Sequence, residues 1–202
     1  MNLSSVDQVR EILGEPGPMA AGKIYDHLNE RMVHFTRLSP LVMVSTVDGD
    51  GFPTISPKGD DPGFVHVEDA GHLLVPERKG NKLAFSFQNI LEGSKVGLLF
   101  MVPGTTEVLR VHGTPTLVHD NSLNQQLTSK TQQALLVMRL QVVNAYFHCG
   151  KALIRSGIWN PDTPRQRVKV SFGQEIAENR SLTEIEAEQI DEGVRERYQT
   201  DI

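Results

Sequence analysis

The sequence predicts a mainly β protein in which short strands form a small antiparallel barrel. From residue 41 onward, β-rich segments alternate with turn signals, and Asp-Gly-Asp-Gly at residues 48–51 is typical of a hairpin because its turn needs positive φ. A single helical pattern is inserted among these segments, without the regular strand–helix alternation that predicts a parallel sheet. Closing the sheet removes its exposed edges, so we expect a barrel.

Two helices are expected before the first strand. Apolar residues recur at helical spacing over residues 6–13, and Gly14 with two prolines soon after it ends that helix. A second helix is expected over residues 19–32, with Leu28 and Met32 on one face. After this helix the pattern changes to that of strands.

The remaining elements follow from local periodicity and from cap residues. The last strand has a side-chain period of two, which distinguishes it from a helix. The expected strands comprise residues 41–46, 52–56, 65–67, 72–75, 95–102, 107–112 with an extension over 116–118, and 136–147. The expected helices comprise residues 81–92 between the N-cap Asn81 and Gly93, a polar helix from the cap Asp120 to about Thr131, residues 151–156, and a charged tail over 181–198.

Length and composition exclude several classes of function. A chain of 202 residues favours one domain with terminal extensions, and 20 basic against 25 acidic residues without a basic run argue against a nucleic-acid partner. Cys149 is the only cysteine, which excludes an intramolecular disulfide and fits a reducing cytoplasm. The longest apolar run, residues 96–102, is far shorter than the roughly 20 residues that span a bilayer. Residues 1–14 lack the pattern of an export signal, so we expect a cytoplasmic protein without membrane association.

The strongest functional signal is the stretch Arg78-Lys79-Gly80-Asn81-Lys82, between an expected strand and the inserted helix. The glycine allows a tight bend, and an anion docked there would meet three cationic side chains and the positive end of the helix dipole. The stretch therefore predicts a phosphate site. A solvated basic turn has the same pattern, so the choice between the two depends on context.

Other constellations predict little chemistry. The seven histidines are scattered and form no H-E-x-x-H pair, so no metal site is expected. His148 and Cys149 are adjacent on a strand and should point to opposite faces, which argues against a nucleophile pair. Both G-x-G-x-x-G and G-x-x-x-x-G-K-[ST] are absent.

Five blocks, taken in order, nevertheless resemble one known family. They are ISPKGD at residues 55–60, PGFV at 62–65, VPER with GN at 75–81, VGLLF at 96–100 and LRVHG at 109–113. The chain resembles the pyridoxamine 5′-phosphate oxidase-like, FMN-binding split-barrel superfamily, and more narrowly its bacterial subgroup of FMN-dependent enzymes. The resemblance covers about residues 36–162.

This resemblance implies a six- or seven-stranded antiparallel split β-barrel with an inserted helix over residues 36–162. Helical extensions are expected at residues 1–35 and 163–202, the latter packing on the same domain or on the partner subunit. It also implies a homodimer with FMN in the groove between two barrels. The basic stretch matches the position at which the family binds the FMN phosphate. The implied cofactor-binding residues are Ile55, Ser56, Pro57, Lys58, Val75, Pro76, Glu77, Arg78, Lys79, Asn81, Lys82 and Trp159.

Two of these roles stay open at the level of sequence. Lys58 could donate to a flavin carbonyl or meet an anionic substrate, but an exposed loop lysine fits equally well. Trp159, the only tryptophan, could stack on the flavin or on a substrate, or it could anchor the core or a dimer interface.

The chain departs from the true oxidases in one element. Those enzymes carry a C-terminal Arg-x-His element that grips the substrate, whereas residues 160–165 read Asn-Pro-Asp-Thr-Pro-Arg. This departure argues against vitamin B6 chemistry but not against flavin binding. The resulting hypothesis is an FMN-dependent oxidoreductase with an unidentified small-molecule substrate and no nameable catalytic residue, because the flavin carries the chemistry. The alternatives are a non-catalytic flavin-binding or storage protein, or a split barrel that uses F420 or haem.

Overall fold

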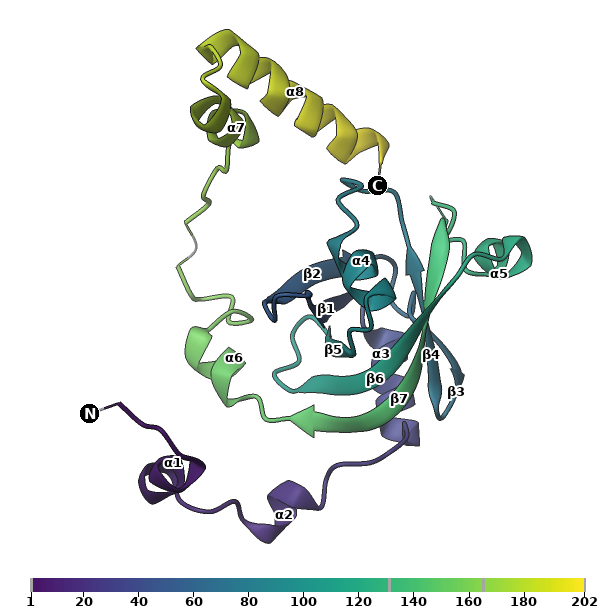
Figure 1. Ribbon diagram of the computed structural model, residues 1–202, viewed down its shortest axis with the longest axis vertical. Helices are drawn as coiled ribbons and strands as arrows, with labels where there is room; N and C mark the ends of the chain where they lie inside the picture. Colours follow the sequence, from purple (N-terminus) through teal and green to yellow (C-terminus); the bar gives the residue numbers. More distant parts are fainter. Residues whose placement is uncertain (1, 131, 165, 202) are drawn as a thin grey trace.

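The computed structural model, which describes residues 2–130, 132–164 and 166–201, contains one antiparallel sheet of seven strands (Figure 1). The strand order is β2-β1-β5-β6-β7-β4-β3, so the sheet is strongly curved but does not close. This confirms the predicted mainly β split barrel. The strands are β1 Leu41–Val47, β2 Pro53–Gly59, β3 His66–Asp69, β4 His72–Glu77, β5 Val96–Met101, β6 Val108–Val118 and β7 Leu136–His148.

Alternating side chains build the barrel interior. Along β1 every second residue is buried, and β5 repeats the pattern with Val96, Leu98 and Phe100. Residues that alternate in this way place their fully buried side chains on one face of the sheet. Phe100 is fully buried in the middle of this face, and α3 (Glu30–Leu38) covers one end with Met32.

The helices lie around the sheet. The inserted helix α4 (Phe85–Leu91) packs against β1, β2 and β6, whereas α7 (Phe172–Arg180) and α8 (Glu184–Thr200) form a hairpin that stands apart from the barrel (Figure 1). Asp201, which follows α8, contacts Lys79 and Gln132 in loops beside the sheet. The remaining helices are α1 Val6–Leu13, α2 Pro18–Ala21, α5 Asn121–Gln126 and α6 Lys151–Ser156.

Several helix predictions are wrong. The single helix expected over residues 19–32 is replaced by α2 and α3, because Gly22 ends the first and the side chain of Asn29 caps the second. The helix capped by Asp120 ends at Gln126, and Thr131 lies outside the described residues. The sequence-based prediction also omitted α7, and it gave residues 107–112 and 116–118 separately, although β6 is continuous from Val108 to Val118.

The open side of the sheet is joined by side chains instead of backbone hydrogen bonds. Strands β2 and β4 are not neighbours in the sheet, yet Lys58 on β2 lies 2.5 Å from Glu77 on β4. Just beyond the ends of the same strands, Asp60 pairs with Arg78 at 2.7 Å. We call this side of the barrel, defined by these four residues, the seam.

Candidate functional site

A cleft of about 720 Å³ opens along the seam, lined by β2, the end of β4 and the segment that leads into α4. This volume is typical of a small-molecule site. The predicted residues that line it are Ile55, Ser56, Pro57, Lys58, Pro76, Glu77, Arg78, Lys79, Asn81 and Lys82. Residues that are distant in sequence therefore meet where the resemblance placed a cofactor.

Two predicted residues do not line this cleft. Val75 points into the barrel core and is 4% exposed. Trp159 follows α6 and is half-buried, and its indole Nε1 is buried without a hydrogen-bond partner among the described residues. Arg165, which ends the segment compared with the oxidases' Arg-x-His element, lies outside the described residues.

The guanidinium of Arg78 is held in a fixed orientation. Its Nε donates to Asp60 Oδ2 at 2.7 Å, and the two side chains are only 14% and 13% exposed. Its Nη1 is buried and has no hydrogen-bond partner among the residues that the structure describes. A buried donor without an acceptor costs free energy, so this Nη1 marks a position that a ligand oxygen would satisfy.

Lys58 and Glu77 form the second ion pair of the seam. The Lys58 ammonium donates to Glu77 Oε2 at 2.5 Å and lies 5.2 Å from the centre of the Phe87 ring. Both side chains are about four-fifths buried, at 21% and 20% exposure, so Lys58 is not the freely exposed loop lysine of the alternative interpretation. Its ammonium faces the cleft.

The C-terminal end of α8 contacts the mouth of the cleft. Lys79 Nζ donates to Asp201 Oδ1 at 2.6 Å, and Gln132 Nε2 donates to the backbone oxygen of Asp201. The Lys79 amide in turn donates to Gln132 Oε1 at 3.2 Å. The hydrogen bond from Lys79 holds the pKa of the Asp201 carboxyl below its usual range. A residue near the C-terminus is thereby attached to the cleft, a contact that local sequence patterns did not indicate.

The predicted helix N-terminus at the phosphate site is wrong. Asn81 does not cap a helix; its Oδ1 accepts the amide of Leu83 at 3.0 Å within a loop, and α4 begins only at Phe85. The loop instead holds Lys82 at φ 62° and Ala84 at φ 57°. Non-glycine residues in this left-handed region are strained, and such strain is common at binding sites. The loop's cations, not a helix dipole, are what the cleft offers to an anion.

Charge in the cleft is largely balanced by internal carboxylates. Lys58, Arg78 and Lys79 are each paired with an acid, whereas Lys82 has no ion pair within the described part of the chain. An anionic ligand must therefore compete with protein carboxylates for its cations. Asp60 and Asp201, which set this competition, were not predicted as site residues.

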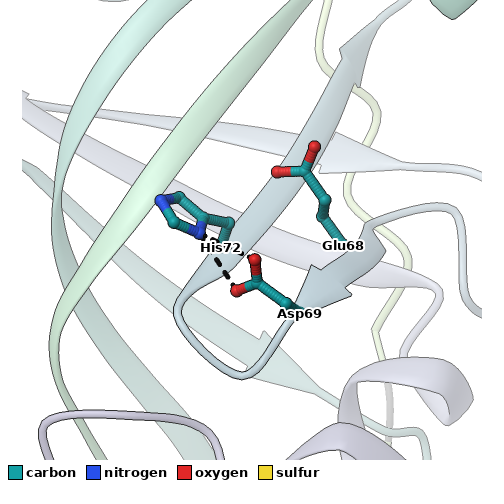
Figure 2. A group of neighbouring side chains, drawn as sticks. All are labelled: Glu68, Asp69 and His72. Carbon is teal, nitrogen blue, oxygen red and sulfur yellow. Dashed lines mark hydrogen bonds and ion pairs between the residues drawn. The ribbon is translucent and has the colours of Figure 1, made fainter.

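A separate cluster of metal-ligating side chains lies on the β3–β4 hairpin (Figure 2). Figure 2 shows the side chains of Glu68, Asp69 and His72. One potential ligand atom from each of them lies within 4.8 Å of the other two. Each already has a protein partner: Asp69 accepts the Gly71 amide and lies 3.0 Å from His72 Nδ1, and Glu68 pairs with Arg139. These contacts explain the cluster as a hairpin turn held by its own side chains.

Within the described residues, no helix is both long and apolar enough to cross a membrane. The free Cys149 is exposed.

Many solved structures are similar to this chain, including the following three. A candidate pyridoxamine 5′-phosphate oxidase from Lactobacillus delbrueckii is 30% identical, with 61% of this chain and 98% of that chain covered and a TM-score of 0.48. HupZ from Group A Streptococcus is 18% identical, with 59% and 93% covered and a TM-score of 0.49. An FMN-binding protein from Syntrophomonas wolfei is 11% identical, with 70% and 95% covered and a TM-score of 0.46.

No curated protein matches the chain. The sequence model of one family does match, over residues 28–149, and it is described as pyridoxamine 5′-phosphate oxidase. The matched region includes all seven strands and the whole seam. More than half of the chain, including the cleft's strands, thus fits a single family, and the protein is a member of the pyridoxamine 5′-phosphate oxidase family.

Proposed function

We propose that the cleft binds FMN and that the protein is a cytoplasmic FMN-dependent oxidoreductase acting on a small molecule. The observation that carries this proposal is the buried, unpartnered Nη1 of Arg78 beside two further cations, Lys79 and Lys82, in a cleft of about 720 Å³. A phosphomonoester carries about −1.5 to −2 charges near neutral pH and accepts charge-assisted hydrogen bonds from such groups. Family membership supports the same ligand.

The residues present fit both ends of this cofactor. Arg78, Lys79 and Lys82 would hold the phosphate, and Lys58 would direct its ammonium to a carbonyl of the ring system. Apolar lining from Phe64 would exclude water from the ring. When bound, FMN supplies the reversible uptake of a hydride or of electrons. The chain's own residues bind and orient it.

We also propose that the protein is a homodimer with the flavin at the subunit interface. Three large apolar side chains that line the cleft are strongly exposed: Ile55 at 64%, Leu83 at 58% and Phe85 at 56%. Contiguous exposed apolar groups beside a cleft mark an interaction surface. A second copy covering them would close the cleft to solvent. Sedimentation equilibrium would test this, and a monomer at micromolar concentration would contradict it.

Ligand identity is the first experiment. Mass spectrometry of the compound released from the purified protein separates FMN from F420 and haem, and reduction by NADH or NADPH separates an enzyme from a storage protein. Release of haem or F420, or reconstitution in which FMN does not bind, would overturn the cofactor assignment. Tight FMN binding without turnover with any donor would support the storage alternative.

The role of Arg78 is tested by the variant Arg78→Ala. We expect its FMN dissociation constant to rise by about 10- to 100-fold, because a charge-assisted hydrogen bond contributes about 1.5–3 kcal/mol. Affinity for riboflavin, which lacks the phosphate, should change little. Flavin fluorescence titration measures both. Lys130→Ala is the matched control, since that side chain is 85% exposed, and equal FMN affinities for the two variants would refute the role of Arg78.

A further inference from the structure

A second group of cations lies on the outer face of β6 and β7, and we call it the Tyr146 cluster: Lys23, Arg110, Tyr146 and His148. Arg110 on β6 is directly opposite Tyr146 on β7, and its Nη1 donates to the Tyr146 hydroxyl at 3.0 Å. Arg110 Cζ is 5.6 Å and Lys23 Nζ 5.7 Å from the centre of the Tyr146 ring. Two cations from distant parts of the chain therefore lie near the Tyr146 ring.

Neither cation has a carboxylate within ion-pair distance in the part of the chain that the structure describes. Within the described residues, five lysines and arginines are half-buried: Arg10, Lys23, Lys58, Arg78 and Arg110. The two in the seam are each paired with a carboxylate at 2.5 Å and 2.7 Å, and Arg10 lies 3.8 Å from a Glu15 carboxylate oxygen. Lys23 and Arg110, in contrast, form no ion pair with any residue that the structure describes. A partly desolvated charge is costly unless an opposite charge or several hydrogen bonds compensate it. The Tyr146 cluster thus carries positive charge that no described carboxylate compensates.

The lowered pKa of the neighbouring His148 is consistent with this excess of positive charge. His148 lies two residues beyond Tyr146 on β7 and so shares its face. Burial lowers the pKa of His148, and the positive charges of Arg110 and Lys23 lower it further. A neutral imidazole at this position can donate a hydrogen bond through one ring nitrogen without adding to the repulsion.

The cluster is separate from the cleft. None of its four residues lines the cleft in the seam. Tyr146 lies on the opposite face of β7 from Ala145, which is fully buried in the barrel core. The cluster therefore faces outward, where a ligand can reach it without entering the barrel.

We propose that Lys23 and Arg110, held at the Tyr146 ring, form a second binding site whose ligand is a small phosphate- or carboxylate-bearing molecule. Arg110 presents a planar fork of donors suited to a two-oxygen anion, and Lys23 adds a mobile point charge. The hydrogen bond to Tyr146 holds the Arg110 guanidinium in place before the ligand arrives, so little of its side-chain entropy is lost on binding. This assignment does not depend on flavin binding in the cleft.

The test is a titration of the full-length protein with inorganic phosphate, followed by NMR signals of the Tyr146 and His148 side chains at constant ionic strength. We expect saturable shifts in the parent protein. The double variant Lys23→Gln/Arg110→Gln should bind at least about tenfold more weakly, since two charge-assisted contacts are lost. The single variant Lys23→Gln, which leaves the sheet untouched, should show part of this loss if the double variant does not fold. Citrate in place of phosphate distinguishes a carboxylate from a phosphate preference.

A matched control removes two exposed cations elsewhere, as in Lys151→Gln/Lys169→Gln, and should retain parent affinity. Equal shifts with chloride would mean an adventitious ion only and would overturn the proposal. Unchanged phosphate affinity in both cluster variants would do the same. A change of oligomeric state in the double variant, without any effect on phosphate, would overturn it in favour of a second protein copy as the counter-charge.

Discussion

The wall of the barrel and its seam are held together by different forces. In the wall, β1, β5, β6 and β7 are joined by continuous antiparallel hydrogen bonding around fully buried apolar side chains such as Phe100. Across the seam, β2 and β4 share no backbone ladder, and two ion pairs join them. This difference indicates that the wall contributes most of the free energy of folding, whereas the polar groups of the seam remain available to a ligand.

The largest effect is expected in the wall. Phe100→Ala removes a side chain that is 0% exposed, and we expect the free energy of unfolding to fall by about 3–5 kcal/mol because a cavity remains. Denaturant unfolding measures this loss. Phe85→Ala, at a cleft-lining side chain that is 56% exposed, should cost less than about 1 kcal/mol. Similar losses in both variants would remove the distinction between wall and seam.

In the seam, Asp60→Asn should act on stability and on ligand binding in opposite directions. Without its counter-charge Arg78 is partly desolvated and unpaired, so we expect the free energy of unfolding to fall by about 1–3 kcal/mol. Asparagine retains an acceptor for Arg78 Nε but no longer repels a phosphate. FMN should therefore bind about three- to tenfold more tightly, and chemical unfolding and fluorescence titration test the two halves.

Riboflavin is the control for Asp60→Asn, since its affinity should not change. Weaker FMN binding would show that the charge of Asp60 serves to position Arg78 and does not compete with the ligand.

The smallest effect is expected at the contact between α8 and the cleft. Asp201→Asn should tighten FMN binding by less than about fivefold, because exposed ion pairs contribute little. The pKa of Asp201 is lowered in the folded state by Lys79, so its stabilising contribution is present above the carboxyl's ordinary pKa of about 4. That contribution is lost as the pH falls through the lowered value.

Hydrogen exchange of α8 measures this contact directly. Protection of its last turn should decrease in acid in the parent and be independent of pH in Asp201→Asn. An acid-insensitive parent would contradict the contact.

Local patterns predicted most of the wall and the cleft. Apolar, β-rich segments bounded by turn residues located β1 and β5, and period-two alternation located β7, each to within one or two residues. Residues 55–58 and 76–82, which belong to the family blocks, line the same cleft. Both signals are local, because the buried face of a strand and a basic loop can each be recognised from a short run of consecutive residues.

The conformation of the loop before α4 and the contacts between residues distant in sequence could not be predicted in the same way. Asn81 is a good N-cap by residue type, but the loop continues to Ala84 because Lys82 and Ala84 adopt positive φ. The pairing of Asp60 with Arg78, and of Lys79 with Asp201, depends on how the sheet curves and on where α8 ends. Neither follows from spacing along the chain.

The attachment of Asp201 beside Lys79 has a practical consequence for anyone who expresses this protein. A purification handle that follows Asp201 would start next to the mouth of the cleft, where a polyhistidine run would compete for the same anions and bias every titration. A handle placed ahead of α1 leaves that entrance unaltered, because α1 lies far from the C-terminal end of α8 (Figure 1).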